Sequence, residues 1–164
     1  MRTKSRASRS GLHIRSADAG DDEFILSLVA RFVDFELPAW RKPNACAEGI
    51  RRDLKQRLDA LPAGEAMFIA EDRDGARVGF LRVQRMRDFF TGKPNCHISD
   101  LVVAPGQDGR GIGRALLEHA QAWAVQQRCA LLTLSVFPGN ARARRLYERA
   151  GFGLDLLRMA KPVR

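Results

Sequence analysis

The chain has 164 residues, 45% of them hydrophobic and 29% charged, which is the size and composition of one folded domain with its own core. Three widely spaced cysteines exclude a disulfide framework and a CxxC metal motif, and the three histidines show no ligand spacing with them. No apolar run approaches the length of a membrane span. We therefore expect a cytoplasmic protein with no metal site and no membrane partner.

The formal net charge of +9 comes from two parts of the chain. Four basic residues lie within the first ten positions, which carry no acidic residue and no large apolar residue after Met1. Such a segment cannot bury enough surface to become ordered, so residues 1–11 are predicted to form a flexible basic tail before a domain at 12–164. The rest of the net charge belongs to that domain.

Hydrophobic periodicity predicts an alternating series of strands and helices along the domain. Asp18 or the pair Asp21–Asp22 can cap the first helix, whose apolar stripe runs from Phe24 to Val33. The order of elements predicts a single α/β domain with a mixed sheet. In chain order, the expected elements are a strand at 12–16, helices at 24–33 and 47–60, strands at 67–71, 77–87 and 97–103, a helix at 112–127, a strand at 131–136, a helix at 141–150 and a strand at 154–160.

Three glycines at alternate positions, Gly109, Gly111 and Gly113, lie where the predicted strand at 97–103 leads into the helix at 112–127. Backbone N–H groups without a Cβ in front of them, at the positive end of a helix dipole, can hold an anion. A P-loop is excluded because no Lys-Ser/Thr pair follows the glycines. A dinucleotide loop is excluded because its third glycine would come one residue later, and no acidic residue follows about twenty positions on.

The glycine loop resembles the pyrophosphate loop of the GCN5-related N-acetyltransferases (GNAT), and a second segment strengthens the resemblance. From Asn140 to Phe152 the chain has an asparagine, a short helix with small and basic residues, a Leu-Tyr pair and a Gly-Phe pair. The resemblance covers about Cys96 to Phe152, and the N-terminal half fits the family only in outline. It implies a mixed central sheet with two parallel strands splayed apart and flanked by helices. It also implies acetyl-CoA as cosubstrate and direct attack by a primary amine.

The resemblance implies which residues hold acetyl-CoA. Pantetheine would pair with the backbone of Leu101 and Val103, and Asn140 would hydrogen-bond the cofactor arm. The pyrophosphate would lie on the amides of the loop and the first helical turn, near basic side chains. The residues implied for that site are Gly109, Arg110, Gly111, Gly113, Arg114 and Arg142.

One loop position departs from the family pattern. The family usually has Gln or Arg where this chain has Asp108, and a carboxylate that faces pyrophosphate would repel it. We expect Asp108 to turn outward while Arg110 or Arg114 supplies positive charge. Alternatively, Gln107 takes this role through a loop one residue longer.

The only tyrosine, Tyr147, matches the general acid of the family. A phenol with a pKa of about 10 is protonated at pH 7 and can protonate a thiolate whose thiol has a pKa of about 8.5. The alternative is a core aromatic with no part in the reaction. The base is left open: polyamine-acetylating members have a Glu-Asp pair where this chain has Ser99–Asp100. Asp100, His97, Glu36 or an ordered water can serve, and an amine of low pKa needs no base.

Two segments are predicted to line the acceptor pocket: the loop between the first two helices and the connection before the strand at 97–103. Glu36, Trp40 and Phe89, with the neighbouring Phe35 and Phe90, would give aromatic walls and one carboxylate. This lining suits a small-molecule amine on an apolar stem, a protein N-terminus or a lysine. Equally, these aromatics can close the core or a homodimer contact.

Two other functions remain as alternatives. A non-catalytic CoA-binding sensor would keep the glycine loop but would not need Tyr147. A basic nucleic-acid-binding protein would use the tail with Arg142, Arg144 and Arg145. Nucleic acid is the weaker alternative because no exposed aromatics are interleaved with these basic residues, which coincide with the CoA positions.

Overall fold

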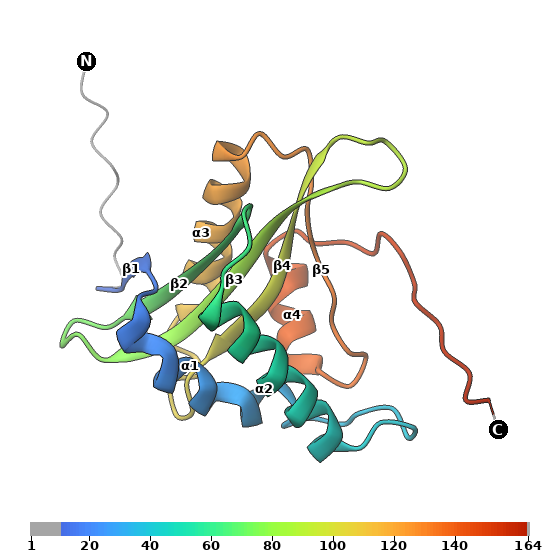
Figure 1. Cartoon of the computed structure of the whole chain (residues 1–164), viewed down its shortest axis with the longest axis horizontal. Helices are drawn as coiled ribbons and strands as arrows, with labels where there is room; N and C mark the ends of the chain where they lie inside the picture. Colours follow the sequence, from blue (N-terminus) through green and yellow to red (C-terminus); the bar gives the residue numbers. More distant parts are fainter. Residues whose placement is uncertain (1–10, 164) are drawn as a thin grey trace.

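The computed structural model describes residues 11–163, so the predicted basic tail lies outside the described residues except for Gly11. Its centre is a five-stranded sheet in the order β1-β2-β3-β4-β5 (Figure 1). The first four strands are antiparallel neighbours, and β5 joins β4 in parallel. The strands are β1 (His13–Ser16), β2 (Glu65–Glu71), β3 (Arg77–Arg87), β4 (Pro94–Val103) and β5 (Leu132–Leu134).

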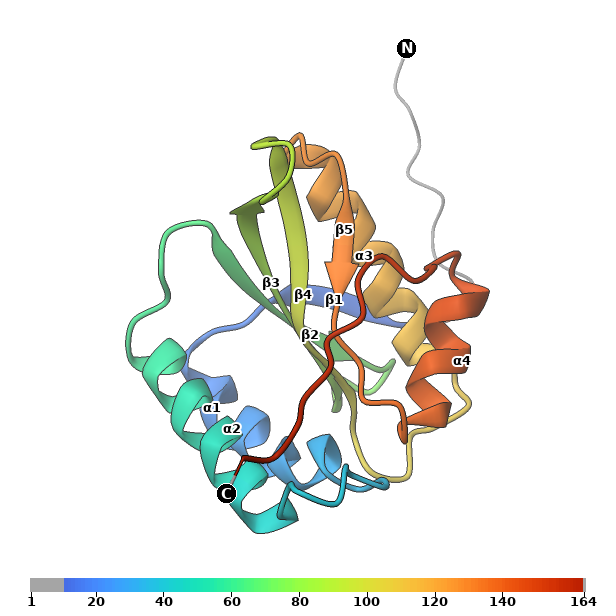
Figure 2. The same cartoon turned by 90° about the vertical axis from the view of Figure 1, so that its right-hand side faces the viewer.

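Helices cover both faces of this sheet, as the sequence predicts for a single α/β domain (Figure 2). On one face lie the 3₁₀ turn η1 (Ala19–Asp21), α1 (Asp22–Ser27), the 3₁₀ turn η2 (Leu28–Phe32) and α2 (Pro43–Asp59). On the other face lie α3 (Ile112–Gln126) and α4 (Ala141–Arg149). The core accordingly has two parts. Leu116 of α3 packs with Ile98 on one face, and Leu54 of α2 packs with Phe80 on the other.

Two helix predictions change in detail. The predicted first helix is divided into α1 and η2, and η2, with fewer residues per turn than an α-helix, still buries Leu28 and Val29. The second helix begins at Pro43, four residues before the predicted start. Proline is favoured in the first turn of a helix, where its missing N–H removes no hydrogen bond.

A buried carboxylate, Asp21, joins the N-terminal elements. It accepts hydrogen bonds from Arg15 Nη1 and Nη2 at 2.7 and 2.9 Å, from Arg77 Nε at 2.6 Å and from the N–H of Asp18 at 2.9 Å. The hydrogen bonds from Arg15 hold the pKa of Asp21 well below its usual range, although burial alone would raise it. The ionised carboxylate therefore stabilises the attachment of η1 to β1 and β3.

We expect Asp21→Asn to lower the free energy of unfolding by about 3 kcal/mol at pH 7, because it leaves two arginines without their shared carboxylate. The folded-state pKa is depressed, so this stabilisation is present above the unfolded pKa of about 4 and is lost as the pH falls below it. Urea unfolding at pH 7 and pH 3 measures both effects.

The control for that experiment is Asp74→Asn, an exposed carboxylate in the turn between β2 and β3. Asp74→Asn should keep both the stability and its pH dependence, whereas Asp21→Asn should flatten the pH dependence. Equal stability losses on acidification in wild type and Asp21→Asn would contradict the assigned role of Asp21.

The predicted strand at 154–160 is wrong. No strand or helix follows α4 within the described residues, and the apolar side chains of Leu154, Leu156, Leu157 and Met159 are 74% to 91% exposed. Their sequence suits a strand, but a strand also needs a neighbour that accepts its backbone hydrogen bonds. No neighbouring strand within this copy pairs with the segment.

Candidate active site

The two parallel strands at the centre of the site separate along their length. β4 and β5 pair at only three positions, the last of which joins Ile98 to Leu134. β5 ends there, whereas β4 continues for five more residues to Val103. The predicted splaying of two parallel strands is therefore present, and it leaves the β5-facing edge of β4 open from Ser99 onward.

A β-bulge coincides with the point where the strands separate. Arg82 of β3 pairs with Asp100 and Val83 pairs with Ile98, so Ser99 is an extra residue in β4. The extra residue changes which face each side chain takes. Ile98 packs in the core on the α3 side, whereas Val102 packs in the core on the α2 side. The sequence analysis did not predict this bulge, because it arises from the register of β4 against β3.

The open edge of β4 carries unpaired backbone groups. The N–H of Ala104 donates to the carbonyl of Val78 at 2.9 Å, and an antiparallel pair exchanges hydrogen bonds at every second residue. Val102 therefore faces β3, whereas Leu101 and Val103 turn their N–H and C=O groups toward the opening. Arg31 Nε already donates to the carbonyl of Val103 at 3.2 Å. Both groups of Leu101 and the N–H of Val103 are left for a ligand.

The glycine loop ends at an uncapped helix N-terminus. Gly111 is the N-cap of α3 with φ of +78°, and no side chain caps the helix there. The first backbone N–H groups of α3 are therefore free of intrahelical partners. A Cβ on Gly109 or Gly111 would meet no atom within 4 Å, so the space above the loop is open. These features together make an anion site.

The third glycine of the loop has a different role. A Cβ on Gly113 would lie 2.8 Å from Leu146 Cδ2. The absence of a side chain at this position allows α3 and α4 to pack closely. Only the first two glycines of the alternating motif leave open space.

Asp108 is held in an ion network beside the loop. Its carboxylate accepts hydrogen bonds from Arg31 Nη2 at 2.9 and 3.0 Å, and Arg142 Nη1 lies 3.3 Å from it. Arg31 Nη1 also donates to Asp34 at 2.6 Å. Two arginines thus neutralise the carboxylate of Asp108, the residue that the sequence analysis described as a departure from the family pattern. Arg31 was missed because nothing in its local sequence distinguishes it from other surface arginines.

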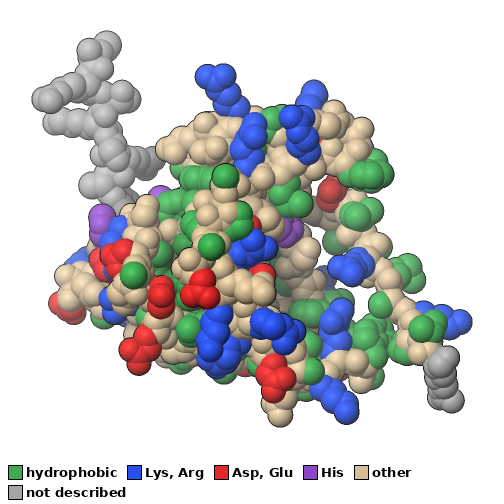
Figure 3. All heavy atoms as spheres, viewed as in Figure 1, with side chains coloured by type: hydrophobic (Ala, Val, Ile, Leu, Met, Phe, Trp, Pro, Cys, Tyr) green, Lys and Arg blue, Asp and Glu red, His purple; other side chains and the backbone are tan. Residues whose placement is uncertain are grey.

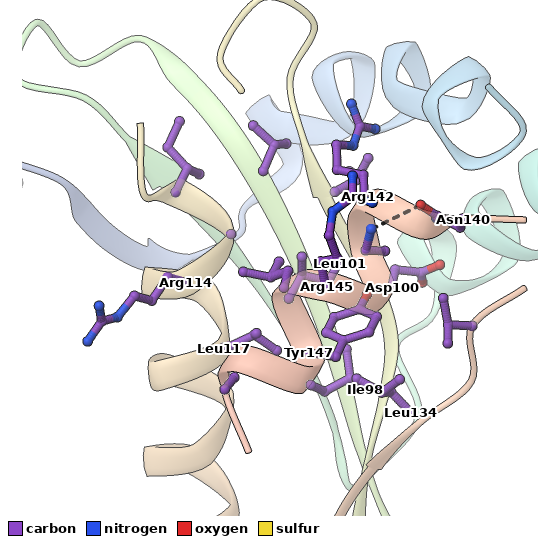
Figure 4. A pocket seen from close by; sticks show the side chains of 18 of the residues that line it. Ile98, Asp100, Leu101, Arg114, Leu117, Leu134, Asn140, Arg142, Arg145 and Tyr147 are labelled. Atoms are coloured by element: carbon purple, nitrogen blue, oxygen red, sulfur yellow. Dashed lines mark hydrogen bonds between the residues drawn. The ribbon is translucent and has the colours of Figure 1, made fainter. Parts of the chain in front are cut away.

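The other basic side chains of the loop have nearby partners. Arg110 donates to Gln107 Oε1. Arg114 Nε donates to Glu118 at 2.9 Å and points away from the other labelled residues in Figure 4. Arg142 and Arg114 both contribute to the lining of the cavity.

Tyr147 lies on α4 and lines the cavity together with Ile98 and Leu101 (Figure 4). Its ring packs at 5.9 Å from that of Phe152. Burial raises the pKa of Tyr147 above its usual value of about 10. Within residues 11–163 no hydrogen bond involves its hydroxyl. The raised pKa keeps the hydroxyl protonated at neutral pH. Its proton is not donated to any group within these residues.

Asn140 begins α4 and divides its polar groups between the helix and the cavity. Its Oδ1 accepts a hydrogen bond from the N–H of Ala143 at 3.1 Å, which caps the helix (Figure 4). The side chain lines the cavity, and its amide group keeps two donors for a ligand.

Of the three side chains predicted as candidate bases, Asp100 alone lines the cavity in the described part of the chain. Arg82 Nε donates to Asp100 Oδ2 at 2.5 Å, and Arg82 Nη2 donates to Asp53 at 2.6 Å. Burial raises the pKa of Asp100 although Arg82 opposes this shift. His97 instead bonds Thr133 through Nδ1 at 2.9 Å, and Glu36 is exposed on its loop.

The cavity has a volume of about 950 Å³ and extends from the glycine loop to the loop after η2. This volume is typical of sites for cofactor-sized ligands. Phe32, Phe35 and Phe137 form its aromatic wall, with Phe35 and Phe137 ring centroids 5.9 Å apart. Phe137 was missed because it follows β5 in sequence and only the fold brings it to Phe35.

The structure does not bring the three predicted substrate residues together at this wall. Glu36 lies beside the cavity, where its carbonyl packs so closely on Gly139 that a Cβ there would collide. Trp40 is half exposed on the same loop and does not line the cavity. Phe89 is 92% exposed in the turn between β3 and β4, stacked edge-to-face on Phe90 at 5.3 Å.

Two kinds of feature are absent from residues 11–163. No helix in this part of the chain is both long enough and apolar enough to cross a bilayer. The same residues contain no group of three or more His, Cys, Asp or Glu side chains placed to bind a metal ion.

Comparison with known proteins decides the family. Residues 30–152 match the sequence profile of the acetyltransferase (GNAT) family. The chain belongs to the GNAT family. The match extends beyond the resemblance in the C-terminal half, because it begins at residue 30.

Individual GNAT relatives agree with this assignment. The chain is 38% identical to streptothricin acetyltransferase of Streptomyces lavendulae over 96 residues, 57% of this chain and 49% of that enzyme. It thus spans about half of that protein. It is 28% identical to the uncharacterized N-acetyltransferase YhfO of Bacillus subtilis over 144 residues, 88% of this chain and 91% of YhfO.

The GNAT fold is also found in solved structures. One is AAC(6')-Iy in complex with the bisubstrate analogue CoA-S-monomethyl-acetylneamine. Its TM-score with this chain is 0.67 at 21% identity, and the superposition covers 93% of this chain and 98% of that one. At this identity the likeness establishes the fold.

Proposed function

We propose that this GNAT protein is an N-acetyltransferase that transfers the acetyl group of acetyl-CoA to a primary amine by direct attack. The observation that carries the proposal is the separation of β4 from β5 above a cavity that also receives the uncapped N-terminus of α3. A strand edge and an anion site, side by side, suit a ligand with an amide-bearing arm and a pyrophosphate.

In this proposal the backbone of Leu101 and Val103 pairs with the pantetheine arm. The pyrophosphate lies on the amides of Gly109, Gly111, Gly113 and Arg114. Arg142 and Arg110 contribute charge, and the amide of Asn140 donates to the cofactor arm. AAC(6')-Iy, which shares the fold, carries a CoA-based analogue, and this supports acetyl-CoA as the cosubstrate.

The chain's own groups would divide the reaction between them. The amine nitrogen forms a bond to the thioester carbon, and the carbon–sulfur bond breaks. The N–H of Leu101 faces the opening and can stabilise negative charge on the thioester oxygen. Tyr147 gives its hydroxyl proton to the departing thiolate, and Asp100 or a water accepts the proton lost by the amine. The products are an amide and free CoA thiol.

The acceptor is proposed as a primary amine on an apolar stem, because Phe32, Phe35 and Phe137 form a wall of the cavity and the carboxylate of Asp100 lines the same cavity. A small-molecule amine, a protein N-terminus and a lysine all meet this description. The relative from Streptomyces lavendulae is named for streptothricin, so a basic antibiotic belongs among the acceptors to be tested.

The test is thiol release from acetyl-CoA in the presence of amines of different classes: polyamines, amino acids, basic antibiotics, and peptides with a free N-terminus or a lysine. Release that depends on one class supports the proposal. CoA binding without release for any class would favour the sensor. Salt-sensitive nucleic-acid binding without CoA binding would favour the alternative of a basic nucleic-acid-binding protein.

We expect Asp108→Asn to strengthen CoA binding roughly fivefold, because an exposed charge interaction is worth up to about 1 kcal/mol. The substitution removes a negative charge from the phosphate site and releases Arg142. Calorimetry at low and high salt measures the gain, which should shrink as salt rises.

The control is Asp34→Asn, which removes a carboxylate from the same network but not from the cavity lining. Its effect on CoA affinity should be smaller. Weaker CoA binding by Asp108→Asn would instead assign Asp108 to holding the loop in shape.

A further inference from the structure

We propose that Arg82 is a positioning residue for the acetyl transfer: it holds Asp100 ionised at the cavity wall, so that Asp100, and not a water, accepts the proton of the attacking amine. This inference rests on the proposed function and adds to it the residue that acts through the base. It concerns five charged side chains on the α2 side of the sheet, which we call the ion cluster: Asp53, Arg57, Glu65, Arg82 and Asp100.

The β-bulge at Ser99 brings Asp100 to Arg82. Arg82 of β3 is the register partner of Asp100 in β4. Val102 packs in the core on the α2 side, and alternate residues of a strand share a face, so Asp100 faces α2 as well. Without the extra residue, Asp100 would share the α3 side with Ile98. The bulge therefore places this carboxylate opposite a buried arginine.

Arg82 binds two carboxylates with one guanidinium group. Its Nε donates to Asp100 Oδ2 at 2.5 Å, and its Nη2 donates to Asp53 Oδ2 at 2.6 Å. Charged side chains of both signs lie on the molecular surface over α1 and α2 (Figure 3). The pair lies beneath that surface, because Arg82 is 7% and Asp100 8% exposed. A buried charge-assisted hydrogen bond is little screened by salt and fixes the orientation of the carboxylate.

The ion cluster has one more carboxylate than it has arginines. Glu65 lies 3.8 Å from Arg82 Nη1 and 3.3 Å from Arg57 Nη1, and Asp53 lies 3.6 Å from Arg57 Nε. Glu65 Oε2 is buried and has no hydrogen-bond partner within residues 11–163. When all five groups are ionised, one negative charge is in excess at a place where burial disfavours it. The cluster is therefore suited to take up one proton.

Asp100 is the member of the ion cluster that lines the cavity, together with the proposed acid Tyr147 (Figure 4). The titratable groups around Asp100 are the other members of the cluster, on α2, β2 and β3, and Tyr147 on α4. Burial raises the pKa of Asp100, and Arg82 opposes this shift. A base works best when its pKa approaches the working pH and it is still ionised when the amine arrives. Arg82 supplies the second condition.

Each group then has one place in the reaction. The amine nitrogen forms its bond to the thioester carbon and loses a proton to Asp100. The carbon–sulfur bond breaks, and the thiolate takes the proton of Tyr147. Asp100 returns its proton to water, and Arg82 keeps the carboxylate ionised for the next turnover.

The experiment measures kcat against pH at a saturating concentration of an amine accepted in the screen above, and the NMR titration of the Asp100 carboxyl carbon in the free protein. The rate should fall as the pH drops through the pKa of Asp100. Arg82→Gln removes the opposing positive charge, so this pKa and the acidic limb of the rate profile should move about one to three pH units higher. Arg82→Lys keeps the charge without the planar guanidinium, so it should move both less than Arg82→Gln does.

Asp53→Asn distinguishes this role from a general loss of structure. It removes a negative charge from the ion cluster and leaves Arg82 paired with Asp100, so the pKa and the acidic limb should move to lower pH. The control Arg85→Gln changes an exposed arginine of the same strand and should leave both unchanged. If Arg82→Gln does not fold, Arg82→Lys and Asp53→Asn give the answer.

An Asp100 pKa that is unchanged in the Arg82 variants, or that rises in Asp53→Asn, would overturn the proposal. An acidic limb that persists unchanged in Asp100→Asn would overturn it as well, because the base would then be another group. These results leave thiol release itself standing. If no amine gives thiol release, the proposed function fails, and the role of Asp100 as a base fails with it.

Discussion

Tyr147→Phe is expected to lower kcat about 100-fold, the usual scale for the loss of a general acid, while CoA affinity stays nearly unchanged. The substitution removes only the hydroxyl and keeps the ring that packs on Phe152. No hydrogen bond of this hydroxyl within residues 11–163 would be lost, so the melting temperature should also stay nearly constant. Because burial raises the pKa of Tyr147, the wild type should keep its acid form to above pH 10.

Phe152→Leu is the matched control, because it disturbs the same packing without touching the hydroxyl. It should lower the melting temperature and leave kcat within a few fold of the wild type. A Tyr147→Phe protein with full turnover would assign protonation of the thiolate to solvent. Lower stability with unchanged turnover would make Tyr147 a packing residue only.

Gly111→Val is expected to weaken CoA binding about 100-fold or more, which corresponds to the loss of two charge-assisted hydrogen bonds. A side chain there would project into the open space at the start of α3, where the pyrophosphate is proposed to lie. The φ of +78° also strains any side chain, so some loss of stability will accompany the effect. Calorimetry with CoA on the folded variant measures the affinity.

Gly75→Val separates the two effects. Gly75 has the same φ of +78° and equally open surroundings, but it lies in the turn between β2 and β3, away from the cavity. The two variants should lose similar stability, and Gly75→Val should keep its CoA affinity. Unchanged affinity in folded Gly111→Val would remove the loop from the cofactor site. Gly113 is less suitable for this test, because a side chain there would collide with Leu146.

Local patterns were enough to predict the parts of the site that are continuous in sequence. The glycines at the start of α3, Asn140 at the start of α4 and Tyr147 about two turns further on all lie along one cavity. The strand edge at Leu101 and Val103 was implied by the resemblance to the GNAT family. In these segments the local structure depends on turn residues, helix caps and hydrophobic periodicity within a few neighbouring positions. It can therefore be predicted from the sequence alone.

The parts that depend on distant contacts were not predictable. Arg31 reaches Asp108 across 77 positions of sequence, and Phe137 meets Phe35 only after folding. The bulge at Ser99 depends on the register against β3. Composition suggested Phe89 as a pocket residue, but its turn lies away from the cavity. The segment at 154–160 has the pattern of a strand, and no pattern can show whether an edge is within its reach.

The most direct test of the acetyl-CoA site is residue-resolved amide exchange with and without CoA. The amides of Leu101 and Val103 face the opening and should exchange rapidly in the free protein, then slow when CoA is added. The amide of Val102 faces β3 and should be slow in both states, which makes it an internal control. The amides of Gly111 and Gly113 should slow with CoA as well. Binding of CoA that leaves Leu101 and Val103 unchanged, or slows amides elsewhere instead, would contradict the placement of the cofactor between β4 and β5.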